Sequence, residues 1–232
     1  MLFGSFDLLL DDPAGFIRLA VLVVFSLVMA ITVHEFSHAL VATGLGDNTA
    51  RSQGRFSLNP IRHLDPGGAV MMLLAGFGWG KPVPIDPHRL AHGLTGTALV
   101  AAAGPLSNVM VAFLLAIPIK LGVLTCNPLA VNRVARVMTG GLREGLGDIV
   151  CLVIFFNLLL AVFNLIPLSP LDGSRVLARV IPADHAPAYA RLQRHGPIIL
   201  VALIMFDFFF HLGFFWRVIG PVVRGLSSLA TG

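Results

Sequence analysis

The sequence predicts an all-α polytopic membrane protein with about four transmembrane helices and a re-entrant β-loop between the first and the second. Hydrophobic residues make up 56% of its 232 residues and charged residues only 12%, which is well outside the composition of soluble domains. Four apolar segments are long enough to cross a bilayer core of roughly 30 Å. No nucleic-acid partner is expected, because the 16 Lys and Arg residues are scattered along the chain.

The four predicted spans lie at about 16–43, 95–120, 149–166 and 197–219, in a single membrane-embedded domain over residues 1–232. The second span is interrupted by Gly104 and Pro105, and the fourth carries Asp207 and His211. Polar groups at such depth need partners. Since i and i+4 residues are neighbours on a helix, we expect Asp207 and His211 to bond each other or to pack against another helix, with a second metal site as the alternative.

The first span is expected to stay in the mature protein rather than to be cleaved as a signal peptide. The 18 residues before the apolar run carry three aspartates and one arginine instead of a basic region. The run is also longer than the apolar part of a typical signal peptide.

Residues of about 66–90 are predicted to form the re-entrant loop. The apolar run within them is too short to span a bilayer, and Pro82, Pro84 and Pro87 exclude a helix interior. Between the prolines, Val83 and Ile85 are the side chains of a possible edge strand. Such a loop can lie at membrane depth only where protein or a water-filled cavity satisfies its backbone.

The Lys and Arg residues predict that both chain termini lie outside. Nine of the 16 fall in two loops, 44–94 and 173–196, which the positive-inside rule then places in the cytoplasm. These nine are Arg51, Arg55, Arg62, Lys81, Arg89, Arg175, Arg179, Arg191 and Arg194.

The motif HEFSH at 34–38 predicts a zinc site inside the first span. On a helix, His34 and His38 share one face and both imidazoles can reach one metal ion, while Glu35 approaches from the adjacent face. With eight His and two Glu in the chain, random placement gives about 0.002 such matches. A pair of core histidines is the alternative. It is disfavoured because ionisable residues inside an apolar span are costly without a metal or a proton-transfer role.

A catalytic zinc needs three protein ligands and an open position for water, so one ligand remains to be found. Asp172 is the candidate, because Pro167 and Pro170 break the third span's helix and let the chain fold Asp172 back toward the bilayer interior. By itself Asp172 would also suit the N-cap of a helix that follows it.

Four motifs together resemble the site-2 protease family of intramembrane metalloproteases, peptidase family M50. They are HEFSH at 34–38, GKPVPI at 80–85, AGPLSN at 103–108 and NLIPLSPLDG at 164–173. The resemblance implies that His34, His38 and Asp172 bind one Zn²⁺ per chain and that Glu35 is the catalytic acid/base. It also implies that Asn164 engages the substrate or the developing oxyanion, and that a β-loop with Val83 and Ile85 binds the substrate in extended form.

The activity implied by the resemblance is regulated intramembrane proteolysis. The substrates would be single-span membrane proteins, cut within or near their transmembrane segments by water bound to zinc, with the lipid bilayer as surroundings. The expected location is a prokaryotic plasma membrane, with the active site toward the cytoplasmic side. The outer loop 121–148 is too short for the PDZ domain of better-known members, and no CBS module follows the last span.

Two other classes of protein remain as rivals. A non-catalytic zinc scaffold or transporter needs the two histidines but not Glu35 beside them. A secreted HExxH peptidase with a membrane anchor needs a soluble catalytic domain, for which no loop here is long enough.

Overall fold

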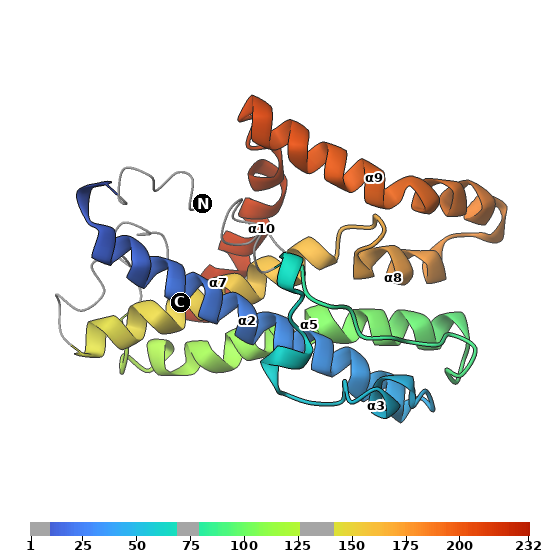
Figure 1. Cartoon of the computed structure of the whole chain (residues 1–232), viewed down its shortest axis with the longest axis horizontal. Coiled ribbons are helices and arrows are strands. Elements are labelled where there is room, and N and C mark those ends of the chain that lie inside the picture. The colour runs from blue at the N-terminus through green and yellow to red at the C-terminus, as the bar shows by residue number, and fades with distance from the viewer. Residues whose placement is uncertain (1–9, 69–78, 126–141) are drawn as a thin grey trace.

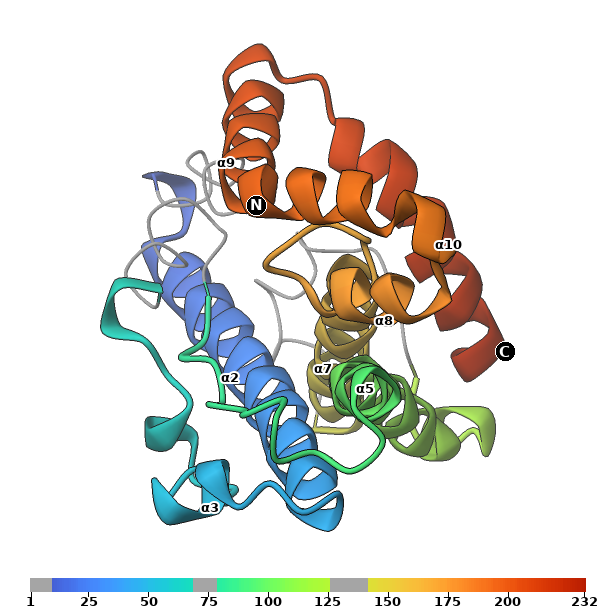
Figure 2. The same cartoon turned by 90° about the vertical axis from the view of Figure 1, so that its right-hand side faces the viewer.

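The computed structural model describes residues 10–68, 79–125 and 142–232. Its elements are α2 (Pro13–Gly44), α3 (Thr49–Ser52), η2 (Pro60–Arg62), α5 (Leu94–Lys120), α7 (Leu142–Asn164), α8 (Asp172–Val180), η3 (Ala183–His185), α9 (Ala186–Phe210) and α10 (Phe214–Thr231). Helices α2, α5 and α7 pack against one another and form the centre of the molecule (Figure 1). Helix α8 covers part of α5, and α10 packs against α5 and α7 (Figure 2).

Small side chains bring the central helices together. Ala30, Ala39 and Ala42 of α2 and Ala112 and Ala116 of α5 are fully buried. Large apolar side chains of the same helices point outward, as a lipid surrounding allows; examples are Ile17, Val21, Leu106 and Met110. Because lipid tails are as apolar as leucine, membrane helices gain stability from close backbone packing, and small residues permit it.

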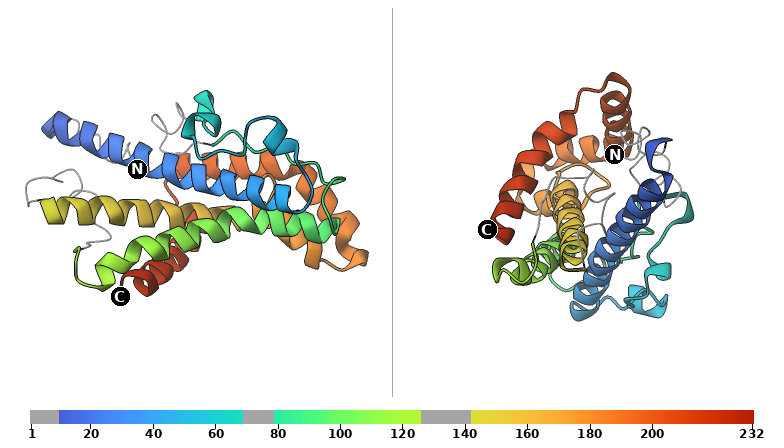
Figure 3. Two further views of the ribbon diagram at one scale, coloured as in Figure 1. Left: turned by 90° about the horizontal axis from the view of Figure 1, so that it is seen from below. Right: turned by 90° about the vertical axis from the view of Figure 1, so that its left-hand side faces the viewer.

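Four helices of the described chain are long and apolar enough to cross a membrane: Pro13–Gly44, Leu94–Lys120, Arg143–Asn164 and Ala183–Phe210. The predicted helical membrane architecture is therefore confirmed for these ranges. Figure 3 shows the central helices running nearly along one direction. The protein is an integral membrane protein.

The second span is a continuous helix and not the interrupted one that Gly104 and Pro105 predict. Helix α5 runs through Pro105 from Leu94 to Lys120. Proline removes one backbone donor, and in membrane helices serine side chains can help to satisfy the backbone near it. Next to this proline, the hydroxyl of Ser107 donates to the carbonyl oxygen of Gly104 over 2.7 Å.

The fourth span ends earlier than predicted. Helix α9 stops at Phe210, and His211 adopts a left-handed conformation with φ of 50°. The Asp207 carboxylate accepts a hydrogen bond from the N–H of Phe214, at the start of α10. Asp207 and His211 share no hydrogen bond in the described chain. The other expectation, contact with another helix, fits Asp207, because its carboxylate supplies an acceptor to the N-terminus of α10.

The loop between α2 and α5 contains a segment without helix or strand that we call the strap, residues 81–86. Residues 69–78 of the predicted re-entrant loop lie outside the described residues. The described parts on either side of that gap pair through one isolated antiparallel bridge, Leu64 with Gly80, and the described chain forms no longer β-ladder. The strap therefore depends on other groups to hold it in place.

Candidate metal centre

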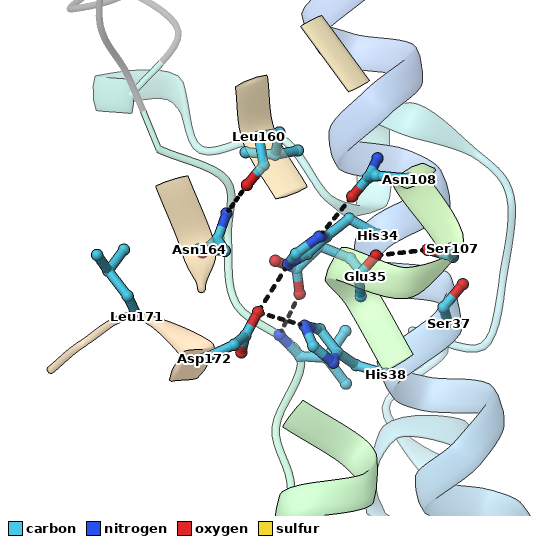
Figure 4. Close-up of polar contacts among 12 residues, drawn as sticks. His34, Glu35, Ser37, His38, Ser107, Asn108, Leu160, Asn164, Leu171 and Asp172 are labelled. Carbon is cyan, nitrogen blue, oxygen red and sulfur yellow. Dashed lines mark hydrogen bonds and ion pairs between the residues drawn. The ribbon is translucent and has the colours of Figure 1, made fainter. Parts of the chain in front are cut away.

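The metal centre begins on α2, where the HEFSH motif lies within the helix. His34 and His38 project from one face, as their spacing of four predicts. Their ring centroids are 4.6 Å apart, and both side chains are buried. The two imidazoles thus face the same small volume (Figure 4).

The segment between α7 and α8 brings a carboxylate to these rings. Helix α7 ends at Asn164, as Pro167 and Pro170 predict, and residues 165–171 turn the chain back. Two short-range hydrogen bonds shape the turn: the N–H of Leu168 donates to Ile166, and that of Leu171 donates to Leu168. Asp172 follows immediately as the first residue of α8.

Asp172 approaches both histidines with a single oxygen atom. Its Oδ2 lies 3.0 Å from Nε2 of His34 and 3.3 Å from Nε2 of His38 (Figure 4). The alternative role as N-cap is wrong, because Leu171 occupies that position and no side chain caps α8. Gly173 permits the tight turn: a Cβ there would lie 2.1 Å from a carbonyl oxygen of the preceding segment.

The other nitrogen of each ring has a partner that determines its tautomer. Nδ1 of His38 lies 2.7 Å from the carbonyl oxygen of Val100, which can only accept. Nδ1 of His34 lies 2.7 Å from Oδ1 of Asn108. Both imidazoles therefore carry a proton on Nδ1, and in the neutral ring each Nε2 presents a lone pair to Asp172.

A second asparagine holds the first in the orientation that this tautomer requires. Nδ2 of Asn108 donates to the carbonyl oxygen of Ala30 over 3.0 Å and to Oδ1 of Asn157 over 2.8 Å. Nδ2 of Asn157 in turn donates to the carbonyl oxygen of Val153. Since both carbonyls can only accept, each amide has one possible orientation, and Oδ1 of Asn108 must face His34.

Three electron-pair donors thus point at one another, and this arrangement fits a bound cation. With both rings neutral, the form that binds a metal ion, Oδ2 of Asp172 is buried without a hydrogen-bond donor. The ligand atoms of His34, His38 and Asp172 all lie within 4.8 Å of one another. The nearest separations approach the roughly 3.4 Å between ligand atoms in a tetrahedral zinc site with bonds of about 2.1 Å. Two imidazoles and one carboxylate are a typical catalytic zinc set that leaves one position open.

Gly104 lets α5 approach the centre. A Cβ at this position would lie 2.6 Å from Cε1 of His34 and 2.6 Å from Nε2 of His38. No real Cβ makes such contacts, so any side chain here would displace the histidines or the helix. The Gly-Pro pair that looked like a helix interruption in the sequence is therefore a packing site for the metal ligands.

Glu35 lies next to the ligands on α2 and contacts the strap. Its Oε2 accepts a hydrogen bond from the backbone N–H of Val83 over 2.9 Å (Figure 4). The side chain of Val83 is buried and packs against Ala39 of α2 and Ala50 of α3. The strap thus touches the carboxylate through its backbone and anchors itself through a side chain.

The remaining predicted site residues are placed differently. Asn164 does not reach the metal ligands, because its Nδ2 donates to the carbonyl oxygen of Leu160 in its own helix (Figure 4). Ile85 is half-buried and packs near Val83. Its backbone N–H is the one strap donor with no partner among the described residues, since those of Lys81, Val83 and Asp86 are bonded and Pro82 and Pro84 have none.

Sequence reasoning missed four residues that position the site. No site role was assigned to Asn108 or Asn157 from the sequence, and Gly104 was interpreted only as part of a break. Arg55 carried no assignment beyond loop charge, although its guanidinium is buried against the strap. The asparagines stand out in the sequence only as polar residues inside apolar spans, and nothing in the sequence shows which of them faces a histidine.

The helical membrane fold and the buried His-His-Asp cluster fit a membrane zinc metalloprotease. The family model described as Peptidase family M50 matches residues 22–206. The chain belongs to this family, which contains the site-2 proteases, and zinc is its cofactor.

Curated relatives carry names of the same kind. The chain is 37% identical over 182 residues to "Putative zinc metalloprotease YwhC" of Bacillus subtilis, which covers 78% of this chain and 79% of the relative. It is 26% identical over 199 residues to "Putative zinc metalloprotease Rip2" of Mycolicibacterium smegmatis, which covers 83% of this chain and 70% of the relative. The Rip2 protein of Mycobacterium tuberculosis strain H37Rv gives 26% over 198 residues, covering 84% and 70%. No solved structure gives a significant match.

Proposed function

We propose that this protein hydrolyses peptide bonds within or near the transmembrane segments of single-span membrane proteins. The observation that best supports this proposal is the depth of the metal centre in the membrane. His34 lies ten residues before the end of α2 at Gly44, and a rise of about 1.5 Å per residue puts the ligands about 15 Å inside the helix. A metal centre at that depth is suited to substrates that are themselves in the membrane.

His34, His38 and Asp172 would hold the zinc ion, and Glu35 would be the general acid/base. When bound, zinc polarises the scissile carbonyl and lowers the pKa of a coordinated water toward about 7. Glu35 takes one proton as the water oxygen bonds to the carbonyl carbon. It then gives a proton to the amide nitrogen as the C–N bond breaks, which leaves a carboxyl and an amine terminus.

The substrate must be extended before it can be cut, because a helix occupies its carbonyls with i to i+4 hydrogen bonds. We infer that the strap receives the unwound segment by strand addition. The N–H of Val83 is engaged by Glu35, so the free N–H of Ile85 is the donor on which pairing would begin. Asn164 gives one amide hydrogen to the carbonyl oxygen of Leu160, and its second amide hydrogen would be the donor to the developing oxyanion.

The proposed orientation places the loops 44–94 and 173–196 in the cytoplasm, in a prokaryotic plasma membrane. The zinc ligands then lie nearer the cytoplasmic end of α2. Labelling of a cysteine placed at Ser52, which is exposed in α3, checks this orientation. A cysteine that reacts with a membrane-impermeant reagent from the outer face of intact cells would show the opposite topology.

Glu35→Gln tests the proposed activity. The variant keeps an acceptor for the N–H of Val83 and leaves the three metal ligands untouched, but it cannot take a proton from water. We expect wild-type zinc content and loss of cleavage, read as accumulated single-span stubs in membrane proteomes. A non-catalytic scaffold would give identical proteomes with and without Glu35. Product termini confined to soluble flanking sequence would contradict cleavage inside the membrane.

A further inference from the structure

Arg55 is a buried cation in the loop between α2 and the strap. Only 7% of its surface is exposed, and it has no carboxylate partner among the described residues. Burying a charge is costly unless hydrogen bonds compensate it. The compensation comes from the strap, because Nη2 of Arg55 donates to the carbonyl oxygen of Lys81 over 2.5 Å and to that of Pro82 over 3.0 Å.

The second of these carbonyls belongs to the peptide unit that contacts Glu35. The Pro82 carbonyl and the Val83 N–H are the two ends of one peptide bond, and that N–H donates to Oε2 of Glu35. The guanidinium therefore lies at the oxygen end of a peptide dipole and the carboxylate at its hydrogen end. Both charges therefore stabilise the same orientation of this peptide unit, and hydrogen bonds in such a chain strengthen one another.

We propose that Arg55 is a positioning residue for the reaction: it holds the strap so that the Val83 N–H orients the Glu35 carboxylate. The proposal rests on the proposed role of Glu35 as acid/base. With Oε2 engaged by Val83, Oε1 is the oxygen that remains for proton transfer, and a fixed carboxylate keeps it in one place. A misplacement of about 1 Å in such a group can cost about a hundredfold in rate.

The strap cannot hold this position through a β-ladder. On one side the N–H of Lys81 donates to His63, and at the far end the N–H of Asp86 donates to Asp47. Between these points, Pro82 and Pro84 have no N–H to donate. Besides the buried side chain of Val83, the two bonds from Arg55 are therefore the hydrogen-bond restraints closest to the peptide unit that reaches Glu35.

Arg55→Met tests the proposal, because methionine keeps an apolar stem and removes the charged donor. We expect zinc content like that of the wild type and a fall in kcat of about tenfold to a hundredfold. Both strap bonds use one nitrogen, so the ammonium of Arg55→Lys can replace them and should restore most of the rate. Arg62→Met is the matched control, since Arg62 donates to Gly54 in the same loop and does not touch the strap.

Hydrogen exchange at the strap gives a second readout that does not depend on cleavage. Amides 81, 83 and 86 should exchange faster in Arg55→Met by about tenfold or more, and at the wild-type rate in Arg62→Met. Unchanged exchange in Arg55→Met would overturn the proposal, as would faster exchange with full cleavage. Loss of zinc in both Arg55 variants would also overturn it, because Arg55 would then support the whole fold. A wild-type protein that cuts no membrane substrate would instead refute the proposed function.

Discussion

The metal ligands and the strap lie side by side along α2, but they are held in different ways. His34, His38 and Asp172 lie on helices whose own hydrogen bonds position the backbone. The strap has no such ladder and is held by side chains from elsewhere, namely Arg55, Glu35 and Asp47. Removal of one ligand should therefore lower the metal affinity. Removal of one of the side chains that hold the strap should instead make the strap less ordered. Graded substitutions can test this difference.

The largest effect is expected for Asp172→Ala, which removes one of the three converging donors. Zinc affinity should fall by at least about a hundredfold and cleavage should reach background, because two imidazoles alone make a poor catalytic site. Metal analysis and chelator competition on the purified protein in detergent measure the loss. His88→Ala is the control, since His88 is exposed and lies outside the cluster. Unchanged zinc affinity in Asp172→Ala would remove Asp172 from the site.

An intermediate effect is expected from the asparagines behind His34. Asn108→Leu removes the acceptor that fixes the His34 tautomer. Asn157→Leu leaves that acceptor in place but removes the hydrogen bond that orients the Asn108 amide. Losses of such outer partners cost about 10-fold to 100-fold in metal affinity, and we expect Asn108→Leu to lie near the upper value and Asn157→Leu near the lower.

Asn164→Leu is the matched control for zinc affinity, because the Asn164 side chain bonds only to its own helix. Chelator competition should give it the wild-type zinc affinity. Equal zinc losses in all three variants would show that general destabilisation accounts for the effect, and not the loss of the hydrogen bonds that link Asn157 and Asn108 to His34.

The smallest effect is expected at Asp47, which holds the far end of the strap. Burial by itself raises the pKa of the Asp47 carboxyl, but hydrogen bonds from Thr49 and Asp86 and the charge of Arg89 outweigh it and hold the pKa below its usual value. The folded pKa thus lies below the unfolded one. The stabilisation from this group is present above about pH 3.9 and is lost as the pH falls through the folded pKa.

Asp47→Asn should lower the free energy of unfolding by about 1 kcal/mol at pH 7, since the hydrogen bonds to a charged acceptor become neutral. The difference from the wild type should shrink as the pH drops below about 3.9. Denaturant unfolding in detergent micelles at pH 7 and pH 3 measures both values. A difference that grows in acid would contradict the assigned pKa direction.

The sequence alone determined the features that depend on local spacing and composition. Long apolar segments determine where helices cross the membrane, and a spacing of four places His34 and His38 on one helix face. Pro167 and Pro170 end a helix wherever they occur, so the turn before Asp172 was also predictable. The family motifs then predicted Asp172 as a ligand.

Only the tertiary structure decided which distant groups meet. His34 and Asn108 are 74 positions apart, and Val83 and Glu35 are 48 apart, so no local pattern relates them. Spacing along a chain specifies a helix face, but contacts between helices depend on how small residues such as Gly104 let them pack. That packing is a property of the whole membrane bundle.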